Sequence, residues 1–175
     1  FKSTDRGVTF NSGNETPLEK IPSQWGLGDM GSAIVLPNND NWILICAPSD
    51  NSIGAILSKD GGTTWTDVTG IFPSGRDAQT GGLVVTENGK FIFAGTDIGP
   101  YVFDVTNEEW FSLAEGIGFF NAMDVDYLPT INTIRFGSWG SGVIDFKIGS
   151  VLNTDNLNIT LNNINLYPNP AKDFV

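Results

Sequence analysis

Histidine is absent from the 175-residue sequence, and cysteine occurs once. Without histidine, the chain cannot form a Ser-His-Asp triad, a histidine-ligated zinc site or a histidine general base from its own residues. The single cysteine, Cys46, excludes a disulfide within the chain. Because Cys46 lies in the apolar run WILICA, we expect a buried structural thiol and not a nucleophile.

Basic residues are also scarce. Nine Lys and Arg stand against 20 Asp and Glu, which gives a formal net charge of −11 and a pI near 4.1. Phosphate backbones and anionic membrane surfaces attract clustered Lys and Arg, so we expect neither as a partner, and in particular no nucleic acid. No apolar run approaches the roughly 18 to 20 residues that span a bilayer, and we expect no membrane span. The sequence predicts no metal site and no cofactor.

What the chain does contain is apolar and rich in glycine. It is 40% hydrophobic with 12 Phe and 5 Trp, enough to bury a core, and its 21 glycines indicate many turns. Short β-rich runs alternate with turn residues, and no stretch has convincing helical periodicity. We therefore predict an all-β fold. The expected strands lie at residues 31–37, 41–47, 53–58, 81–87, 90–96, 98–103, 108–113, 122–128, 132–138 and 142–148.

One short segment occurs twice. Residues 58–65 read SKDGGTTW, and residues 3–10 read STDRGVTF. A weaker copy, FDVTNEEW at 103–110, has its aspartate one place early, and GSGVIDF at 140–146 resembles DIGPYVF at 97–103. The copies recur about every 45 to 55 residues, which is the scale of a propeller blade made of four short strands.

The residue types in SKDGGTTW have folding reasons. Asp60 can accept hydrogen bonds from backbone N–H groups a few residues on, and Gly61 and Gly62 allow the positive φ of a tight turn. Thr64 favours re-entry into a strand, and its hydroxyl can bond across the loop. Trp65 can bury a large ring between neighbouring sheets. The motif is therefore predicted to hold the turn between the third and fourth strands of a sheet and to carry no chemistry.

Both segments resemble Asp-box (BNR) repeats, whose pattern is Ser-X-Asp-X-Gly-X-Thr-Trp/Phe. Such repeats occur in sialidase-like, sortilin-like and xyloglucanase-like β-propellers, and the segments AGTDIGPYVF and FGSWGSGVIDF resemble the last blades of bacterial members. The resemblance covers residues 1–148. It implies about three blades of four-stranded antiparallel sheets, with the Asp boxes at the periphery. The matching positions are Ser3, Asp5, Gly7, Thr9, Phe10, Ser58, Asp60, Gly62, Thr64 and Trp65.

A closed propeller needs at least about four blades. About three blades leave exposed strand edges, so we expect the chain to be the C-terminal part of a longer propeller. The last unit shows three strands in residues 122–148. We expect an N-terminal strand of the parent protein to supply the fourth and close the ring.

The end of the chain differs in composition. Residues 149–163 are polar and Asn-rich, which is typical of a linker. Residues 164–175 hold a Tyr-Pro-Asn-Pro motif, which is either one more loop entering a strand or a sorting signal. It resembles the opening of the C-terminal sorting domain (Por) of the type IX secretion system of Bacteroidetes, and would be a truncated start of that domain. The motif residues are Tyr167, Pro168, Asn169 and Pro170.

This second resemblance implies a location as well as a partner. It implies contact with the type IX secretion machinery, export across the outer membrane of a Gram-negative bacterium, and then release or attachment at the cell surface. We therefore expect a secreted or surface-attached protein.

Propellers bind ligands where the loops between blades and the loops between second and third strands converge on one face. Four candidate ligand-binding residues lie in such loops. Asp77 beside Arg76 is either an acid or base tuned by a cation or half of a solvated ion pair. Asp97 either holds its turn or contacts a ligand. Trp139 either stacks on a sugar ring or packs at the channel mouth.

Glycosidases place two carboxylates roughly 5 to 10 Å apart across the scissile bond. The sequence pattern pairs no two of its carboxylates, so no catalytic residue is predicted. We expect a propeller protein that acts on or binds extracellular glycans. The alternative is a non-catalytic propeller for adhesion or protein binding, and a parent glycoside hydrolase with its active site on further blades stays open.

Overall fold

The computed structural model describes residues 3, 5–9, 31–46, 53–72, 80–114 and 121–148, and the backbone of Ile164–Tyr167. These residues form twelve strands and one short 3₁₀ helix, so the prediction of an all-β fold is confirmed. The strands are β1 (Ser32–Leu36), β2 (Asn39–Cys46), β3 (Ala55–Ser58), β4 (Thr66–Asp67), β5 (Thr80–Val85), β6 (Phe91–Thr96), β7 (Gly99–Asp104), β8 (Glu109–Ser112), β9 (Ala122–Leu128), β10 (Thr133–Ser138), β11 (Gly142–Lys147) and β12 (Ile164–Tyr167), and the helix η3 is Pro129–Ile131.

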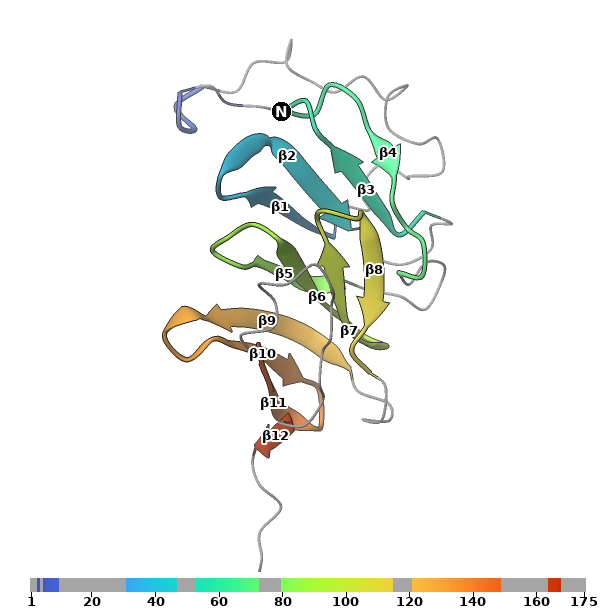
Figure 1. The fold of residues 1–175 in the computed structure, drawn as a ribbon, viewed down its shortest axis with the longest axis vertical. Helices are drawn as coiled ribbons and strands as arrows, with labels where there is room; N and C mark the ends of the chain where they lie inside the picture. Colours follow the sequence, from blue (N-terminus) through green and yellow to red (C-terminus); the bar gives the residue numbers. More distant parts are fainter. Residues whose placement is uncertain are drawn as a thin grey trace, which may run out of the picture.

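The strands form three four-stranded antiparallel sheets, each a meander in chain order. We call β1-β2-β3-β4 the first sheet, β5-β6-β7-β8 the second and β9-β10-β11-β12 the third. Figure 1 shows the three sheets side by side in the order of the sequence. Their first strands, β1, β5 and β9, lie next to one another, so the sheets converge along one edge.

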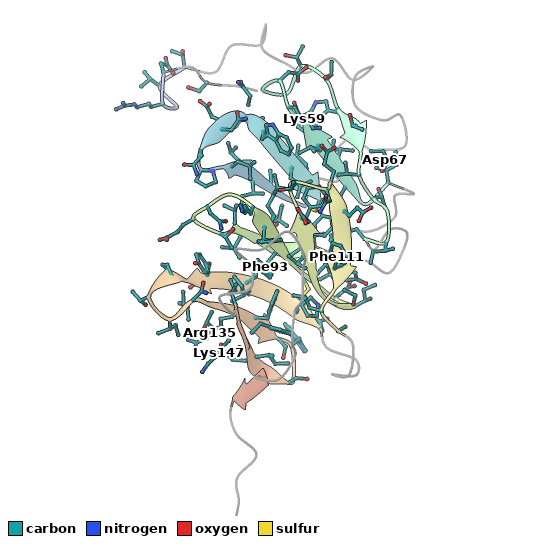
Figure 2. All side chains as sticks on the ribbon, in the orientation of Figure 1. Lys59, Asp67, Phe93, Phe111, Arg135 and Lys147 are labelled. Carbon is teal, nitrogen blue, oxygen red and sulfur yellow. The ribbon has the colours of Figure 1, made fainter. Side chains whose placement is uncertain are left out.

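Two apolar clusters join the sheets. Side chains alternate between the two faces of a strand, and the second sheet is apolar on both faces, so it contributes to both clusters. The cluster between the first and second sheets contains Leu44, Leu57, Ile92, Ala94, Phe103 and Trp110. The cluster between the second and third sheets contains Phe91, Phe93, Val102, Ile134, Phe136, Ile144 and Phe146. Figure 2 places Phe93 between the second and third sheets.

Glycines let the inner strands approach one another closely. A Cβ atom on Gly81 would lie 1.9 Å from the carbonyl oxygen of Met123, and one on Gly95 would lie 2.3 Å from that of Ala122. No side chain fits at such distances, so backbone packs against backbone between β5, β6 and β9. The close approach explains why the second sheet has glycines within its strands.

The third sheet differs from the sequence-based expectation. We expected three strands with the fourth supplied from elsewhere, but β12 pairs antiparallel with β11, from Val143↔Tyr167 to Phe146↔Ile164. The edge of β11 presents unpaired N–H and C=O groups, which any nearby extended segment can satisfy. Pro168 follows directly in the sequence and cannot donate to a ladder, so the strand ends at Tyr167.

Trp65 is half-buried in the described structure, less than expected for a ring between two sheets. The equivalent residue of the second sheet, Trp110, is 4% exposed and takes that position. Its ring centroid lies 4.1 Å from that of Phe72 and 5.0 Å from that of Phe103. The difference follows from the neighbours: Trp110 has the first sheet against it, whereas Trp65 lies on the outer side of the first sheet.

Candidate functional site

Two turns, residues 3–9 and 58–64, share one set of hydrogen bonds, and we call them the Asp turns. In the turn that joins β3 to β4, Asp60 Oδ1 accepts the backbone N–H of Thr64 at 2.8 Å, and Oδ2 accepts its hydroxyl at 2.6 Å. Ser58 Oγ accepts the N–H of Gly62 at 2.8 Å and donates to Asp60 Oδ1 at 2.9 Å. The carboxylate is thus occupied by bonds within its own turn.

The Asp turn at residues 3–9 repeats this geometry. Asp5 accepts the N–H of Thr9 at 2.8 Å and its hydroxyl at 2.5 Å, and Ser3 Oγ accepts the N–H of Gly7 at 2.7 Å. The backbone repeats as well, with φ of 59° at Arg6 and 87° at Gly7. The backbone of Arg6 is in the left-handed region, which residues other than glycine rarely adopt. The local hydrogen bonds therefore fix this turn strongly.

The same hydrogen bonds set the acidity of both aspartates. The hydroxyl of Thr64 and then its N–H hold the pKa of Asp60 at about 2, and those of Thr9 do the same for Asp5. A general acid or base works best with a pKa near the operating pH, so these carboxylates are poorly suited to proton transfer at neutral pH. Their geometry is that of turn-holding groups.

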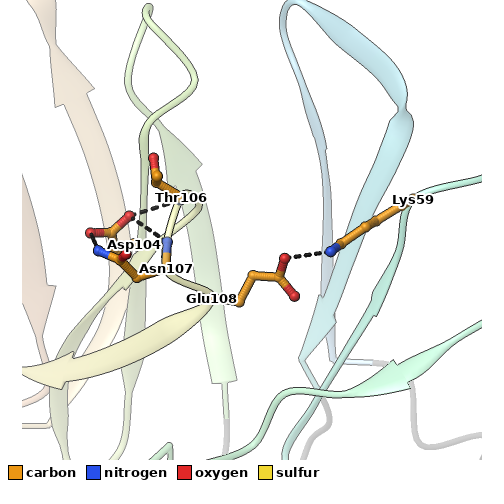
Figure 3. Close-up of polar contacts among 5 residues, drawn as sticks. All are labelled: Lys59, Asp104, Thr106, Asn107 and Glu108. Carbon is orange, nitrogen blue, oxygen red and sulfur yellow. Dashed lines mark hydrogen bonds and ion pairs between the residues drawn. The ribbon is translucent and has the colours of Figure 1, made fainter.

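The corresponding turn of the second sheet, between β7 and β8, is held by hydrogen bonds between residues two or three apart in the sequence (Figure 3). Asp104 Oδ1 accepts the N–H of Thr106 at 2.8 Å, and Oδ2 accepts the side-chain amide of Asn107 at 2.9 Å. Glu108, at φ 57°, forms an ion pair with Lys59 of the first sheet. The aspartate one place early therefore still holds its turn, and the turn also links two sheets.

The opposite end of the sheets holds the expected ligand face. In an antiparallel meander, the turn between second and third strands leaves from the same end as the connection to the next sheet, whereas the Asp turns leave from the other end. Asp97 lies at this end, between β6 and β7, and Trp139 lies between β10 and β11. The backbone N–H of Trp139 donates to the carbonyl of Asn121, in the connection between the second and third sheets, at 3.2 Å.

Trp139 is presented to solvent on a fixed turn. Its residue is 86% exposed, the largest exposure among the exposed large hydrophobic residues of the described structure. Ser138 Oγ donates to the carbonyl of Gly142 at 3.0 Å and accepts the N–H of Ser141 at 3.1 Å, so these hydrogen bonds close the turn that carries Trp139. The structure shows the residue exposed, and both roles expected for Trp139 stay predictions.

The turn at Asp97 is also held by side-chain hydrogen bonds. Thr96 Oγ1 donates to the carbonyl of Gly99 at 2.6 Å and accepts the N–H of Ile98 at 3.3 Å. Ile98 is 39% exposed beside Asp97. Arg76 and Asp77, together with Phe10 and the motif residues 168–170, lie outside the described residues, so their expected roles stay predictions.

Sequence reasoning did not find a groove at the outer edge of the first two sheets. Its volume is about 570 Å³, and it runs between β4 and β8. Its lining includes the apolar residues Val68, Ile71 and Trp110 and the acidic residues Asp67, Glu108 and Glu109. The acidic run at 108–109 was the available signal, but the groove forms only when two sheets pack, and single-sheet patterns do not show it.

Three further observations concern the thiol, groups of metal-binding side chains and membrane-spanning helices in the described residues. Cys46 is fully buried, and burial raises the pKa of its thiol far above the usual value, as expected for a structural cysteine. In the described part of the chain, no three His, Cys, Asp or Glu side chains are grouped to hold a metal ion. No helix there is long and apolar enough to cross a membrane.

The arrangement of the three sheets is similar to parts of several solved structures. The GH74 enzyme of Niastella koreensis aligns with a TM-score of 0.53 at 15% identity, and the GH74 xyloglucanase of Xanthomonas campestris with 0.54 at 10%. Each alignment covers 67% of this chain and 20% of the other. The Swd1 β-propeller domain of Myceliophteria thermophila aligns with 0.54 at 15% identity, over 81% of this chain and 45% of that one.

The three sheets are blades of a β-propeller. At such identities the likeness shows the fold alone, and the chain spans less than half the length of each of these structures. No family model matches the sequence, and no curated protein matches it. The blade assignment gives the strands their places: β1, β5 and β9 are innermost, and the Asp turn at 58–64 joins the two outermost strands of the first blade.

Proposed function

We propose that this protein is an extracellular β-propeller that binds glycans through the end of the blades on which Trp139 lies. The observation that carries the proposal is the exposed indole of Trp139 on a hydrogen-bonded turn. An indole offers a flat, polarisable face, and the apolar face of a sugar ring packs well on such a surface. Binding of this kind needs no catalytic residue.

The fold gives independent support of a coarser kind. Two structures with a similar fold are GH74 enzymes, and one of them is a xyloglucanase. Xyloglucan is therefore the first glycan to test. Protein binding is the second candidate function, because exposed tryptophan is also enriched at the energetic centres of protein interfaces.

The experiment compares the wild-type chain with Trp139→Ala on immobilised xyloglucan, other plant β-glucans and a glycan array. We expect wild-type binding and a loss of at least about tenfold in affinity for the variant. Ile131→Ala is the matched control, because Ile131 is 59% exposed at the opposite end of the third blade. Absence of glycan binding by the wild-type chain would favour the protein-binding candidate, and release of reducing ends would make the chain a hydrolase.

We also propose that the protein reaches the cell exterior by type IX secretion, with residues 149–163 as the linker and residues 164–175 as the start of the sorting domain, whose first segment, Ile164–Tyr167, pairs with β11 of the third sheet in this chain. The support is the motif Tyr167-Pro168-Asn169-Pro170 at the end of the propeller sequence. Substitution of Pro168 and Pro170 by Ala in the full-length protein should leave it in the periplasm of a Bacteroidetes host. Normal export of that variant would remove the support for this route.

A further inference from the structure

The groove between β4 and β8, which we call the outer groove, has no part in the glycan binding proposed above. Its volume is about 570 Å³, and its lining comes from residues within 66–71, at the end of the first blade, and from residues 108–110 of the second. Among the described strands, β4 pairs only with β3, and β8 only with β7. Figure 1 shows β4 and β8 along the same side of the molecule. The outer groove therefore lies between two strands that each have an open edge.

Strand register decides which backbone groups of β8 face that edge. Leu113 donates its N–H to the carbonyl of Pro100, beside β7, at 2.9 Å. Along an antiparallel strand, residues that bond to one neighbour alternate with residues whose N–H and C=O point the other way. Trp110 and Ser112 therefore direct their backbone groups away from β7, toward the open edge. An edge of this kind can accept one more strand.

The indole of Trp110 lacks a hydrogen-bond partner. The residue is 4% exposed, and its Nε1 has no acceptor among the described residues. A buried tryptophan N–H normally has a partner, because an unsatisfied donor costs free energy. Phe72 packs on the ring at 4.1 Å between centroids, and the same tryptophan lines the outer groove. A carbonyl oxygen that enters the outer groove can supply the missing acceptor.

The outer groove is acidic. It is lined by Asp67, Glu108 and Glu109, and none of the described residues that line it is basic. Lys59 forms an ion pair with Glu108, whereas Asp67 and Glu109 are exposed and have no basic partner among the described residues. Because the two carboxylates come from different blades, a row of basic side chains along the groove complements them.

Alternation along β8 sets the order of side chains on an added strand. Residues opposite each other on paired strands share one face of the sheet. The face that carries Trp110 also contacts Val68, and Ile71 is 63% exposed in the same groove, so a residue opposite Trp110 is best apolar. A residue opposite Glu109 lies on the other face, where a lysine or arginine can pair with the carboxylate.

We propose that the outer groove binds an extended segment of a partner protein, in which apolar and basic residues alternate, as an additional strand along β8. The backbone of the segment pairs with the open edge, one of its carbonyls accepts the N–H of Trp110, and its basic side chains lie beside Asp67 and Glu109. The first two blades line this site, whereas Trp139 belongs to the third. The proposal therefore does not depend on glycan binding.

The test measures binding of labelled peptides to the full-length protein by fluorescence anisotropy at physiological salt. The probe is a peptide of about seven residues in which valine and lysine alternate. One comparison peptide has glutamate in place of lysine. Another keeps every lysine but has proline in place of the central valine, which removes a backbone donor at unchanged charge. We expect the valine–lysine peptide to bind at least about tenfold more tightly than either comparison peptide.

Matched variants locate the site. Asp67→Asn combined with Glu109→Gln should weaken binding of the valine–lysine peptide at least about fivefold. Asp40→Asn combined with Glu87→Gln makes the same change of net charge at exposed carboxylates that do not line the outer groove, and should change the affinity by less than about twofold. Thermal melting checks that both double variants are folded.

The indole N–H gives a direct readout of the contact. Binding of the valine–lysine peptide should shift the NMR resonance of the Trp110 indole N–H, which is assigned by its disappearance in Trp110→Phe. Trp139→Ala should bind the peptide as the wild-type protein does, which separates this site from the glycan site.

Four results would overturn the proposal. The wild-type protein might not bind the valine–lysine peptide, or it might bind the proline peptide equally well, which would indicate attraction by charge alone. Equal losses in the two double variants would indicate the same. An unchanged Trp110 resonance in the peptide complex would place the bound peptide elsewhere on the protein.

Discussion

At the scale of single residues, the aspartates of the Asp turns show how a motif can look catalytic and serve folding. Asp5 and Asp60 each accept two hydrogen bonds from one threonine, and both have a pKa of about 2. An unpaired carboxylate in a binding cleft would leave its oxygens available to a ligand. Here the oxygens are engaged in the turn, so the acidity of these groups reflects local geometry.

The lowered pKa predicts a pH dependence of stability. The unfolded carboxyl of Asp60 titrates near 3.8 and the folded one near 2, so the stabilisation from its ionised form is fully present above pH 4 and is lost as the pH falls through 2. Asp60→Asn should lower the melting temperature at neutral pH and flatten its fall in acid. Circular dichroism melts across that range, with an NMR titration of the Asp60 carboxyl, check this. A carboxyl titrating near 4 in the folded chain would contradict it.

Residue identity alone predicted the Asp turns well, because each of their bonds joins groups two to four residues apart. Trp139 was identified as a candidate because the glycines around it indicate a tight turn. Its exposure could not be predicted, because whether a neighbouring loop covers the indole depends on contacts between residues far apart in the sequence. The groove between β4 and β8 was not predicted either, because it is lined by residues of two sheets that lie far apart in the sequence.

At the scale of elements, the strands and hairpins follow from alternation and turn chemistry, and the expected runs all contain strands where the structure describes them. Two strands lie outside the expected runs: β4, which follows the Asp turn at 58–64, and β12, whose four residues were assigned to the tail. A four-residue segment has too little pattern to identify it as a strand, and its pairing depends on the open edge of β11, which no local pattern reveals.

Packing between blades should dominate the stability of the third blade. Phe136 on β10 is fully buried in the cluster between the second and third blades, where its ring centroid lies 5.4 Å from that of Phe146 on the neighbouring strand. Phe136→Ala should lower the free energy of unfolding by about 3 to 5 kcal/mol, because it removes buried area and leaves a cavity. Ile131→Ala, at an exposed position, should change it by less than about 0.5 kcal/mol. Urea unfolding of both variants measures the difference, and equal effects would contradict the packing described.

At the scale of the whole molecule, the propeller separates its two ends. The Asp turns and the ion pair between Lys59 and Glu108 hold the outer strands at one end. The turns with Asp97 and Trp139 lie at the other. The net charge of −11 disfavours polyanionic partners and leaves neutral polymers as the better match for an exposed indole.

The central claim is this division between a structural end and a binding end, and one calorimetric comparison tests it most directly. Asp60→Ala and Trp139→Ala are titrated with the same xyloglucan oligosaccharide at a temperature where both are folded. We predict that Asp60→Ala binds as the wild-type chain does but melts at a lower temperature, whereas Trp139→Ala melts as the wild-type chain does and no longer binds. Loss of binding in folded Asp60→Ala, with binding retained in Trp139→Ala, would contradict the account.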